Sequence, residues 1–489
     1  MSVVMSNADN VKNSVQNATD NAQSKNLVSQ NATDNAQSKN TTNATNISNM
    51  SGENSVQNAT DNAQSKNATN AIKKIVVYNL GCKVNQYEAD SLVKALLAKG
   101  FEVSENLEFA DCYIINTCAV TNEAERKSRQ CVARCLKFNA SAKVLVCGCA
   151  SQFNSKQFAT KPNVTFVKGV FSKMDLVNKI DSFGVEITPP QCVYEDNLFS
   201  QNTRNRAYVK IQDGCNNFCS YCLIPYLRGR SRSRSIASVV EECQQQQKVA
   251  SEIVLIGIDI SSYGKDFGAG IADLFVALKD INARIRLGSL EASLIDDAFL
   301  SSLSNLKCFC PHFHLSLQSG CDDVLKAMNR HYTAQEYFQK VCLIRKYFPM
   351  AAITTDLICG YPTETQQNFE QTLQFIKKAQ FADMHIFGYS KREGTKASKL
   401  KVLPKEILIE RCAKAEQVAK VMRQDYLKKF VNLNLSVLIE EEIDGIMQGY
   451  SENYIRVSVV GNAKINEVVT VKILDFSADC VLKGEVINE

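Results

Sequence analysis

The sequence predicts an α/β protein with three folded parts: a doubly wound parallel sheet at 71–190, a full or partial (β/α) barrel at 201–430, and a small β-barrel at 431–489. Strand-like and helix-like segments alternate through the first two parts, which is typical of parallel sheets. The last part instead holds five short alternating strands with turn residues between them, which favours a small closed barrel. With 489 residues, 45% of them hydrophobic, the chain can bury several cores.

Residues 1–70 are predicted to be a disordered, Asn-rich tail. NSVQNATDNAQSKN occurs at 13–26 and again at 54–67, with SQNATDNAQSKN between them at 29–40. Ordering such polar repeats costs backbone entropy with no apolar burial to offset it. Residues 1–10 lack the charged start and apolar core of a signal peptide, and no run of 18 apolar residues predicts a membrane span. We therefore expect a cytoplasmic protein without membrane contact, whose activity survives deletion of the tail.

Three cysteines of the first folded part follow its expected strands. The patterns predict strands at 72–80, 111–117 and 142–148, with helices at 85–100 and 121–138. Cys82, Cys118 and Cys149, here called the edge trio, each lie just beyond the end of one strand. Because the carboxyl ends of parallel strands meet at one edge, where such folds bind ligands, we expect the edge trio to converge. Cys112 and Cys147, inside the strands, are expected in the core.

A second group of cysteines opens the central part. The loop DGCNNFCSYCLIPYLRGRSRSR (213–234) contains Cys215, Cys219 and Cys222, here called the loop trio. Structural zinc sites usually have four ligands, whereas this loop supplies three thiols with no histidine nearby. Three thiolates suit a soft iron–sulfur site, and on a four-iron cluster they leave one iron open. An odd total of 19 cysteines in a chain without secretion signals also argues against a disulfide framework.

Basic residues are concentrated after the loop trio and further on in the central part. The loop ends in alternating arginines, which form either a solvated charge run or a set of RNA phosphate contacts: Arg228, Arg230, Arg232 and Arg234. Residues 391–430 hold twelve Lys/Arg against five Asp/Glu and could steer a polyanion. Residues 431–489 hold ten Asp/Glu against four Lys/Arg and should repel phosphate as a whole. Tyr450, Tyr454 and Arg456 could still form a local stacking patch.

Several motifs together resemble one enzyme family. The Cys-x3-Cys-x-aromatic-Cys spacing, with Tyr221 as the aromatic residue, resembles the signature of radical S-adenosylmethionine (SAM) enzymes. With NLGCKVNQYEAD (79–90), INTCAVTNEAERKSRQ (115–130) and HLSLQSGCDDVLKAMNRHYT (314–333), it resembles the methylthiotransferase family from about 71 to 488. The resemblance implies a radical SAM core with the partial form of the barrel, and a C-terminal TRAM-like domain that is taken to bind tRNA.

The resemblance also implies the cofactors, which are two 4Fe–4S clusters and SAM. The loop trio would hold the cluster whose open iron chelates SAM, and the edge trio would hold a cluster that carries the sulfur to be donated. Strands are expected at 252–258, 283–293, 312–320, 353–362 and 384–390. Within the loop and near the strand ends, five residues could face SAM or serve as ordinary polar residues: Tyr221, Ser289, Glu291, Gln318 and Asp356. No catalytic acid or base is assigned, since the cofactors would carry the chemistry.

The substrate is inferred from the same motifs. NLGCKVNQYEAD and the RGRSRSR ending most resemble family members that add a methylthio group to carbon 2 of N6-threonylcarbamoyladenosine, next to the anticodon of tRNA. Members that act on isopentenyladenosine usually read more like YGCQMN, and those that act on a ribosomal protein more like LGCPKN. Lys83 and Val84 fit neither. The implied partners are this tRNA and an electron donor of the flavodoxin or ferredoxin type, and we expect a monomer.

Two alternatives of a different kind stay open at this stage. A non-catalytic, metal-stabilised RNA-binding protein would use the same cysteines and arginines, and it predicts zinc with filled coordination. An iron–sulfur electron carrier explains the thiols but neither the barrel, the basic loop nor the C-terminal strands. Iron and acid-labile sulfide analysis separates the enzyme from the zinc protein.

Overall fold

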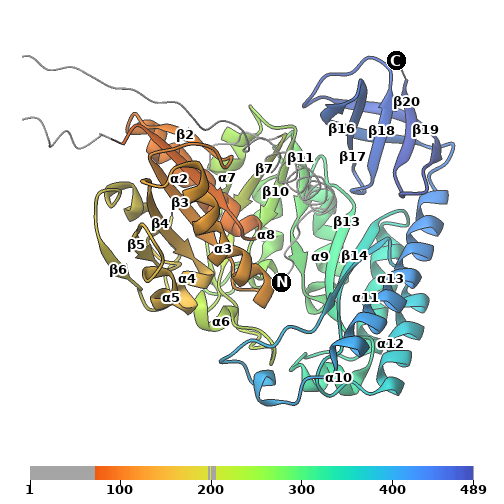
Figure 1. Ribbon diagram of the computed structural model, residues 1–489. Coiled ribbons are helices and arrows are strands. Elements are labelled where there is room, and N and C mark those ends of the chain that lie inside the picture. The colour runs from red at the N-terminus through yellow and green to blue at the C-terminus, as the bar shows by residue number, and fades with distance from the viewer. Residues whose placement is uncertain (1–71, 197–198, 200–204, 488–489) are drawn as a thin grey trace, which may run out of the picture. The chain divides into compact units, whose positions relative to one another are not determined.

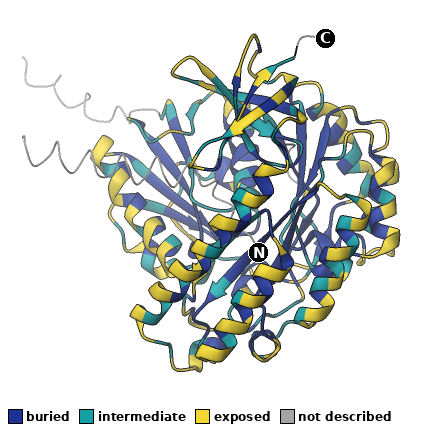
Figure 2. Cartoon of the chain, turned by 90° about the vertical axis from the view of Figure 1, so that its right-hand side faces the viewer, coloured by how far each residue is buried: buried dark blue, intermediate teal, exposed yellow. Residues whose placement is uncertain are grey.

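A computed structural model describes residues 72–196, 199 and 205–487 (Figure 1). The predicted tail at 1–70 lies outside them. Among the described residues, no helix combines the length and the apolar composition that crossing a membrane requires. In Figure 2 the strands are mostly dark blue, whereas the helices carry exposed outer faces, as expected when helices cover buried sheets.

The first folded part is a six-stranded parallel sheet in the order β2-β1-β3-β4-β5-β6. Its strands are β1 (Lys74–Asn79), β2 (Glu102–Ser104), β3 (Cys112–Thr117), β4 (Lys143–Gly148), β5 (Val164–Lys168) and β6 (Gly184–Glu186). Its helices are α2 (Lys83–Ala98), α3 (Asn122–Phe138), α4 (Cys149–Phe153), α5 (Ser155–Ala159) and the 3-10 turn η1 (Lys173–Asn178). The strand order reverses between β1 and β3, so the predicted doubly wound sheet is confirmed.

The central part consists of two parallel sheets that follow one another in chain order, β7-β10-β11 and β12-β13-β14-β15. Their strands are β7 (Arg206–Lys210), β10 (Glu252–Ile256), β11 (Arg284–Leu287), β12 (Ser289–Leu290), β13 (His312–Gln318), β14 (Ala352–Cys359) and β15 (Asp383–Gly388). Gly288 separates β11 from β12, and a Cβ there would lie 3.1 Å from the Leu255 carbonyl oxygen. Within the described residues no pairing joins β7 to β15. This is the partial barrel that the resemblance implies.

Helices connect the strands of the partial barrel. They are α6 (Ile224–Leu227), α7 (Ile236–Gln246), α8 (Ile271–Ala277), α9 (Asp297–Ser302), α10 (Asp322–Ala327), α11 (Ala334–Tyr347) and α12 (Gln366–Ala379). The sequence sets where they begin: Thr333 and Glu336 form a reciprocal capping box at α11, and Thr365 with Asn368 does the same at α12. A short antiparallel pair, β8 (Gln212–Asp213) and β9 (Arg232–Ser233), closes the base of the loop-trio segment.

The C-terminal part is a closed barrel in the order β16-β17-β18-β20-β19. The long helix α13 (Lys405–Lys428) precedes β16 (Asn434–Ile443), β17 (Ile446–Ser451), β18 (Arg456–Val460), β19 (Val468–Phe476) and β20 (Leu482–Val486). Alternate residues such as Val437, Ile439 and Val471 are fully buried and fill the interior. The five predicted strands are confirmed.

Candidate active site

The edge trio converges as the sequence predicts. Cys82 is the residue before α2, three residues after the end of β1; Cys118 directly follows β3; and Cys149 begins α4 after β4. All three line one pocket. The adjacent strand ends of β1, β3 and β4 therefore bring together residues that lie far apart in the sequence.

The partial barrel supplies another part of the wall of this pocket. Gly257, directly after β10, and Ser289, at the start of β12, both line the pocket. Ile224 and Arg228 line it from the segment that follows the loop trio. About 650 Å³ of empty space lies in and in front of the pocket, and this volume includes open solvent. Its remaining lining is largely apolar and includes Val84, Val120, Ile256 and Ile258. A reacting group here would be held between the N-terminal sheet and the partial barrel.

The donor set of the edge trio fits an iron–sulfur cluster. Burial raises the pKa of the Cys82 thiol, and it raises the pKa of Cys118 to about 12. Buried thiols of this kind are good ligands only when a metal displaces the proton. The three sulfurs need not be as close as the ligands of a single ion, because each would bind a different iron atom.

The loop trio lies between β8 and α6, where every sulfur accepts a hydrogen bond. The Asn217 N–H donates to Cys215 Sγ at 3.4 Å, and the Ile224 N–H donates to Cys222 Sγ at 3.4 Å. Nη1 of Arg330 donates to Cys219 Sγ at 3.3 Å. Such donors stabilise negative charge on sulfur and tune iron–sulfur clusters. The loop trio therefore also fits a cluster, and Arg330 is a contact that the sequence did not suggest.

The five proposed SAM contacts lie in different surroundings. Ser289 lines the pocket of the edge trio. Glu291 forms an ion pair with Arg330, which links it to Cys219 of the loop trio. Gln318 ends β13 with a left-handed φ of 68°, and Tyr221 is half-buried inside the loop. Contact of these four residues with SAM stays a proposal.

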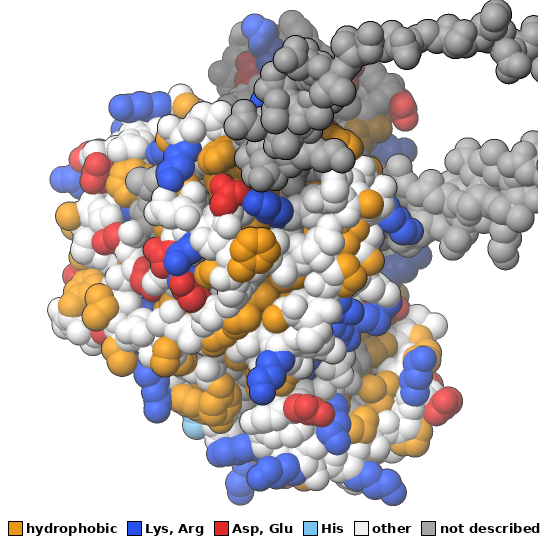
Figure 3. All heavy atoms as spheres, turned by 60° about the vertical axis from the view of Figure 1, so that its left-hand side comes forward, with side chains coloured by type: hydrophobic (Ala, Val, Ile, Leu, Met, Phe, Trp, Pro, Cys, Tyr) orange, Lys and Arg blue, Asp and Glu red, His pale blue; other side chains and the backbone are white. Residues whose placement is uncertain are grey.

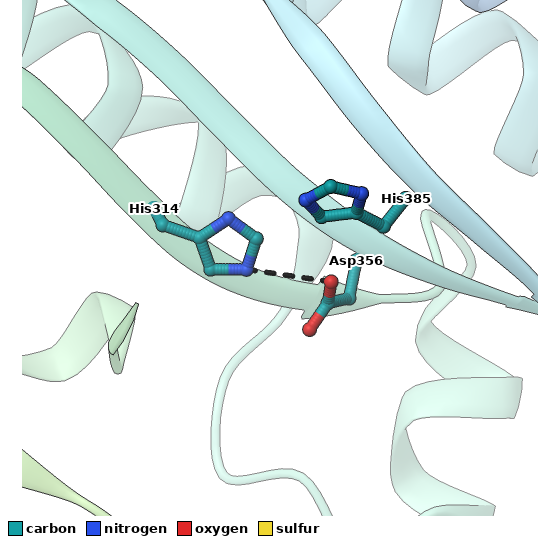
Figure 4. A group of neighbouring side chains, drawn as sticks. All are labelled: His314, Asp356 and His385. Carbon is teal, nitrogen blue, oxygen red and sulfur yellow. Dashed lines mark ion pairs between the residues drawn. The ribbon is translucent and has the colours of Figure 1, made fainter. Parts of the chain in front are cut away.

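Asp356, the fifth of these residues, lies inside β14 in a cluster with two histidines (Figure 4). His314 Nε2 lies 3.4 Å from Asp356 Oδ1, and potential ligand atoms of His314, Asp356 and His385 are all within 4.8 Å of one another. Neither carboxylate oxygen of Asp356 has a hydrogen-bond partner among the described residues. Nδ1 of His314 is fixed by Thr354 Oγ1 at 2.9 Å. The sequence did not predict this group, because its members come from three separate strands.

Three of the four arginines predicted to contact RNA are buried. Arg228, Arg232 and Arg234 are only 0%, 2% and 1% exposed. The carboxylates of Asp213, Glu88 and Glu242 pair with them. The RNA-contact prediction is therefore wrong for these three residues, since a buried guanidinium with a carboxylate partner is not available to phosphate. Arg230 is exposed, and its guanidinium lies 4.4 Å from the centre of the Phe218 ring.

The residues of the predicted stacking patch, Tyr450, Tyr454 and Arg456, contact other side chains of the protein. The rings of Tyr450 and Tyr454 stack with centroids 4.9 Å apart. The Arg206 guanidinium covers both rings at 4.9 and 5.0 Å, and Arg286 lies 4.7 Å from the Tyr454 ring. Arg456 instead donates to Gln448 and Glu441. The two tyrosines thus form part of a cationic and aromatic group next to the partial barrel.

Comparison with known proteins covers both cysteine trios. Residues 74–169 match the model of the uncharacterized protein family UPF0004, and residues 209–376 match the radical SAM superfamily. The chain is 34% identical over 422 residues to threonylcarbamoyladenosine tRNA methylthiotransferase MtaB of Thermotoga maritima, spanning 84% of this chain and 96% of that protein. The Bacillus subtilis MtaB is also 34% identical over 422 residues, spanning 82% of this chain and 93% of the relative.

A relative with a different printed substrate is almost as similar. The tRNA-2-methylthio-N(6)-dimethylallyladenosine synthase of Caldicellulosiruptor saccharolyticus is 33% identical over 448 residues, spanning 84% of this chain and 92% of that protein. Identity alone therefore does not separate the two substrates.

Proposed function

We propose, given that this chain belongs to the radical SAM methylthiotransferase family, that it adds a methylthio group to carbon 2 of N6-threonylcarbamoyladenosine next to the anticodon of tRNA. The observation that carries the proposal is the single pocket that joins the edge trio to the strand ends of the partial barrel. The MtaB relatives and the NLGCKVNQYEAD motif support the choice of base. We further expect a cytoplasmic monomer that receives electrons from a flavodoxin-type or ferredoxin-type donor.

The proposed cofactors follow from the two trios. The loop trio would hold a 4Fe–4S cluster that binds SAM, and the edge trio would hold a second 4Fe–4S cluster. When bound, these groups would supply a carbon radical and a sulfur atom, which replacement of a C–H bond without acidity requires. Side-chain acids and bases alone cannot perform that replacement.

The chain's own residues would position and shield the reaction. Apolar side chains such as Val84, Ile224 and Ile258 form much of the pocket wall and would keep water from the reacting atoms. Arg330 would hold Cys219 through its hydrogen bond and Glu291 through its ion pair. Ser289 lies where a ligand shared by the two halves of the pocket would contact it.

The substrate is tested by mass spectrometry of tRNA nucleosides from cells that lack the protein. We expect 2-methylthio-N6-threonylcarbamoyladenosine to disappear and the unmodified precursor to accumulate, with recovery after expression of the intact chain. A chain in which the loop trio is alanine serves as the control that should not restore the product. Unchanged levels of this nucleoside in the deletion would refute the substrate. Loss of the methylthio derivative of isopentenyladenosine would favour the second substrate, which a relative of 33% identity supports.

Arg230 is the one residue of the arginine run that stays a proposed phosphate contact. Figure 3 shows one face of the molecule, on which lysine and arginine side chains lie among acidic and hydrophobic ones. Arg230→Ala is expected to weaken tRNA binding a few-fold and to reduce the slope of log affinity against log salt by about 1. Filter binding over a range of salt concentrations measures both.

The control for this prediction is Lys279→Ala, which removes an exposed cation that follows α8. It should leave the salt slope nearly unchanged. An Arg230→Ala protein with the wild-type slope would show that Arg230 makes no phosphate contact.

A further inference from the structure

Lys83 occupies a distinctive place beside the edge trio. It is the first residue of α2, directly after Cys82, and its side chain lines the same pocket as the three cysteines. The side chain is half-buried. Any group that reacts at the edge trio would therefore lie close to an ammonium.

The other cations of this pocket and of the surroundings of Lys83 form ion pairs within the protein, whereas Lys83 forms none among the described residues. Arg228 pairs with Glu88 at 2.9 Å, Arg206 pairs with Glu440 at 2.7 Å, and Arg286 pairs with Glu252 at 2.6 Å. Among the described residues no carboxylate forms an ion pair with Lys83. A half-buried cation without a counter-charge is costly unless a bound group supplies one.

The side chain of Lys83 lies near residues of the partial barrel and of the C-terminal barrel. The side chains of Tyr454, Arg206 and Arg286 lie near Lys83, as do those of His312 and His385. Glu252 is also near, but Arg286 donates to both of its oxygens, at 2.6 and 2.9 Å. Asp356 faces His314. Glu252 is thus engaged with Arg286, and neither Glu252 nor Asp356 forms an ion pair with Lys83 among the described residues.

We propose that Lys83 binds a carboxylate on the N6 substituent of the substrate adenine and so selects an anionic substituent over an apolar one. The inference rests on the proposed function. The threonylcarbamoyl group ends in an amino-acid carboxylate, whereas an isopentenyl group is apolar and neutral. In adenine a single ring nitrogen separates carbon 2 from the carbon that bears N6. A base whose carbon 2 reaches the edge trio therefore carries its N6 substituent into the pocket that Lys83 lines.

The test compares two anticodon stem-loop RNAs with the anaerobically prepared holoenzyme. One RNA carries N6-threonylcarbamoyladenosine, and the other carries the same base with its carboxylate converted to a carboxamide. The wild-type protein should bind and convert the carboxylate RNA about 30-fold better or more, which corresponds to removing one partner of a desolvated charge pair. Lys83→Gln should reduce that preference to nearly one, and Lys83→Arg should retain much of it. Equilibrium binding of RNA gives a readout that does not depend on turnover.

Controls separate this role from a structural one. Lys99→Gln, directly after the end of the same helix, should keep the full preference, and iron and sulfide contents are measured for each variant. A Lys83→Gln protein that keeps the wild-type preference would overturn the inference, as would equal losses on both RNAs. If Lys83→Gln fails to retain its clusters, a wild-type protein with no preference for the carboxylate would overturn the inference by itself. Conversion of isopentenyladenosine RNA but not threonylcarbamoyladenosine RNA by wild type would instead refute the proposed function.

Discussion

Replacing Cys215, Cys219 and Cys222 together with alanine is expected to remove half of the iron and acid-labile sulfide and to reduce methylthio transfer below detection. The loop trio lies on one segment between β8 and α6, whereas the edge trio comes from three strand ends of a separate sheet. The second cluster should therefore form without the first. Iron and sulfide assays on anaerobically reconstituted protein, with product analysis by mass spectrometry, measure both effects.

The matched control and the reciprocal variant sharpen this prediction. Cys243→Ala removes a fully buried cysteine of α7 that belongs to neither trio, and it should keep the full iron content. Alanine at all three edge-trio positions should also halve the iron, keep reductive cleavage of SAM and lose sulfur transfer. Simultaneous loss of both clusters from either triple variant would contradict independent sites. Zinc without sulfide in the wild type would identify a non-catalytic metal protein instead.

Replacing Arg228 with methionine is expected to lower the free energy of unfolding by about 3 kcal/mol. Its guanidinium is fully buried and donates to Glu88 at 2.9 Å and to Asp213 at 3.1 Å. Methionine would leave these carboxylates buried with fewer partners. The effect should lie at the lower end of the range for breaking a buried pair, because Lys173 and Lys210 still contact Glu88. Urea unfolding under anaerobic conditions measures the change.

The neighbouring Arg230 provides the control. Arg230→Met changes an exposed side chain of the same run and should alter stability by less than about 0.5 kcal/mol. Equal stabilities of the Arg228→Met and Arg230→Met proteins would contradict the assigned role of the buried network.

The same network predicts how stability depends on pH. Burial alone would raise the pKa of Glu88, but Arg228, Lys173 and Lys210 hold it well below the ordinary value of 4.5. A carboxyl with a depressed folded-state pKa contributes its full stability above about pH 4.5 and loses it as pH falls through the folded-state pKa. Arg228→Met should raise that pKa, so acid unfolding is expected to begin at a higher pH. Acid titration followed by circular dichroism compares the two proteins.

The cysteine positions could be predicted because they depend on chain order alone. Once 72–80, 111–117 and 142–148 are recognised as parallel strands, their carboxyl ends must share an edge, and the structure places the edge trio there. The short edge strands β2 and β6 were missed, since three residues are too few for a periodic pattern. One predicted strand at 283–293 is divided into β11 and β12, because Gly288 approaches the backbone of β10.

Whether each arginine of the run is buried or exposed depends on contacts that the local sequence does not reveal. Arg228 finds Glu88 at a separation of 140 residues, in another sheet domain, so the run RGRSRSR looks like a solvated stretch when it is considered alone. The cluster of His314, Asp356 and His385 was missed for a similar reason. Its members are single polar residues in three buried strands, and only the register of β13, β14 and β15 brings them together.

The contact between Arg228 and Glu88 has a consequence for recombination between relatives. Glu88 belongs to the helix that follows Cys82, and Arg228 belongs to the segment that follows Cys222. A chimeric enzyme assembled from the N-terminal half of one homologue and the C-terminal half of another would have to inherit both residues as a matched set. Otherwise the graft would leave a buried charge with fewer partners where the two parts of the chain that line the pocket meet.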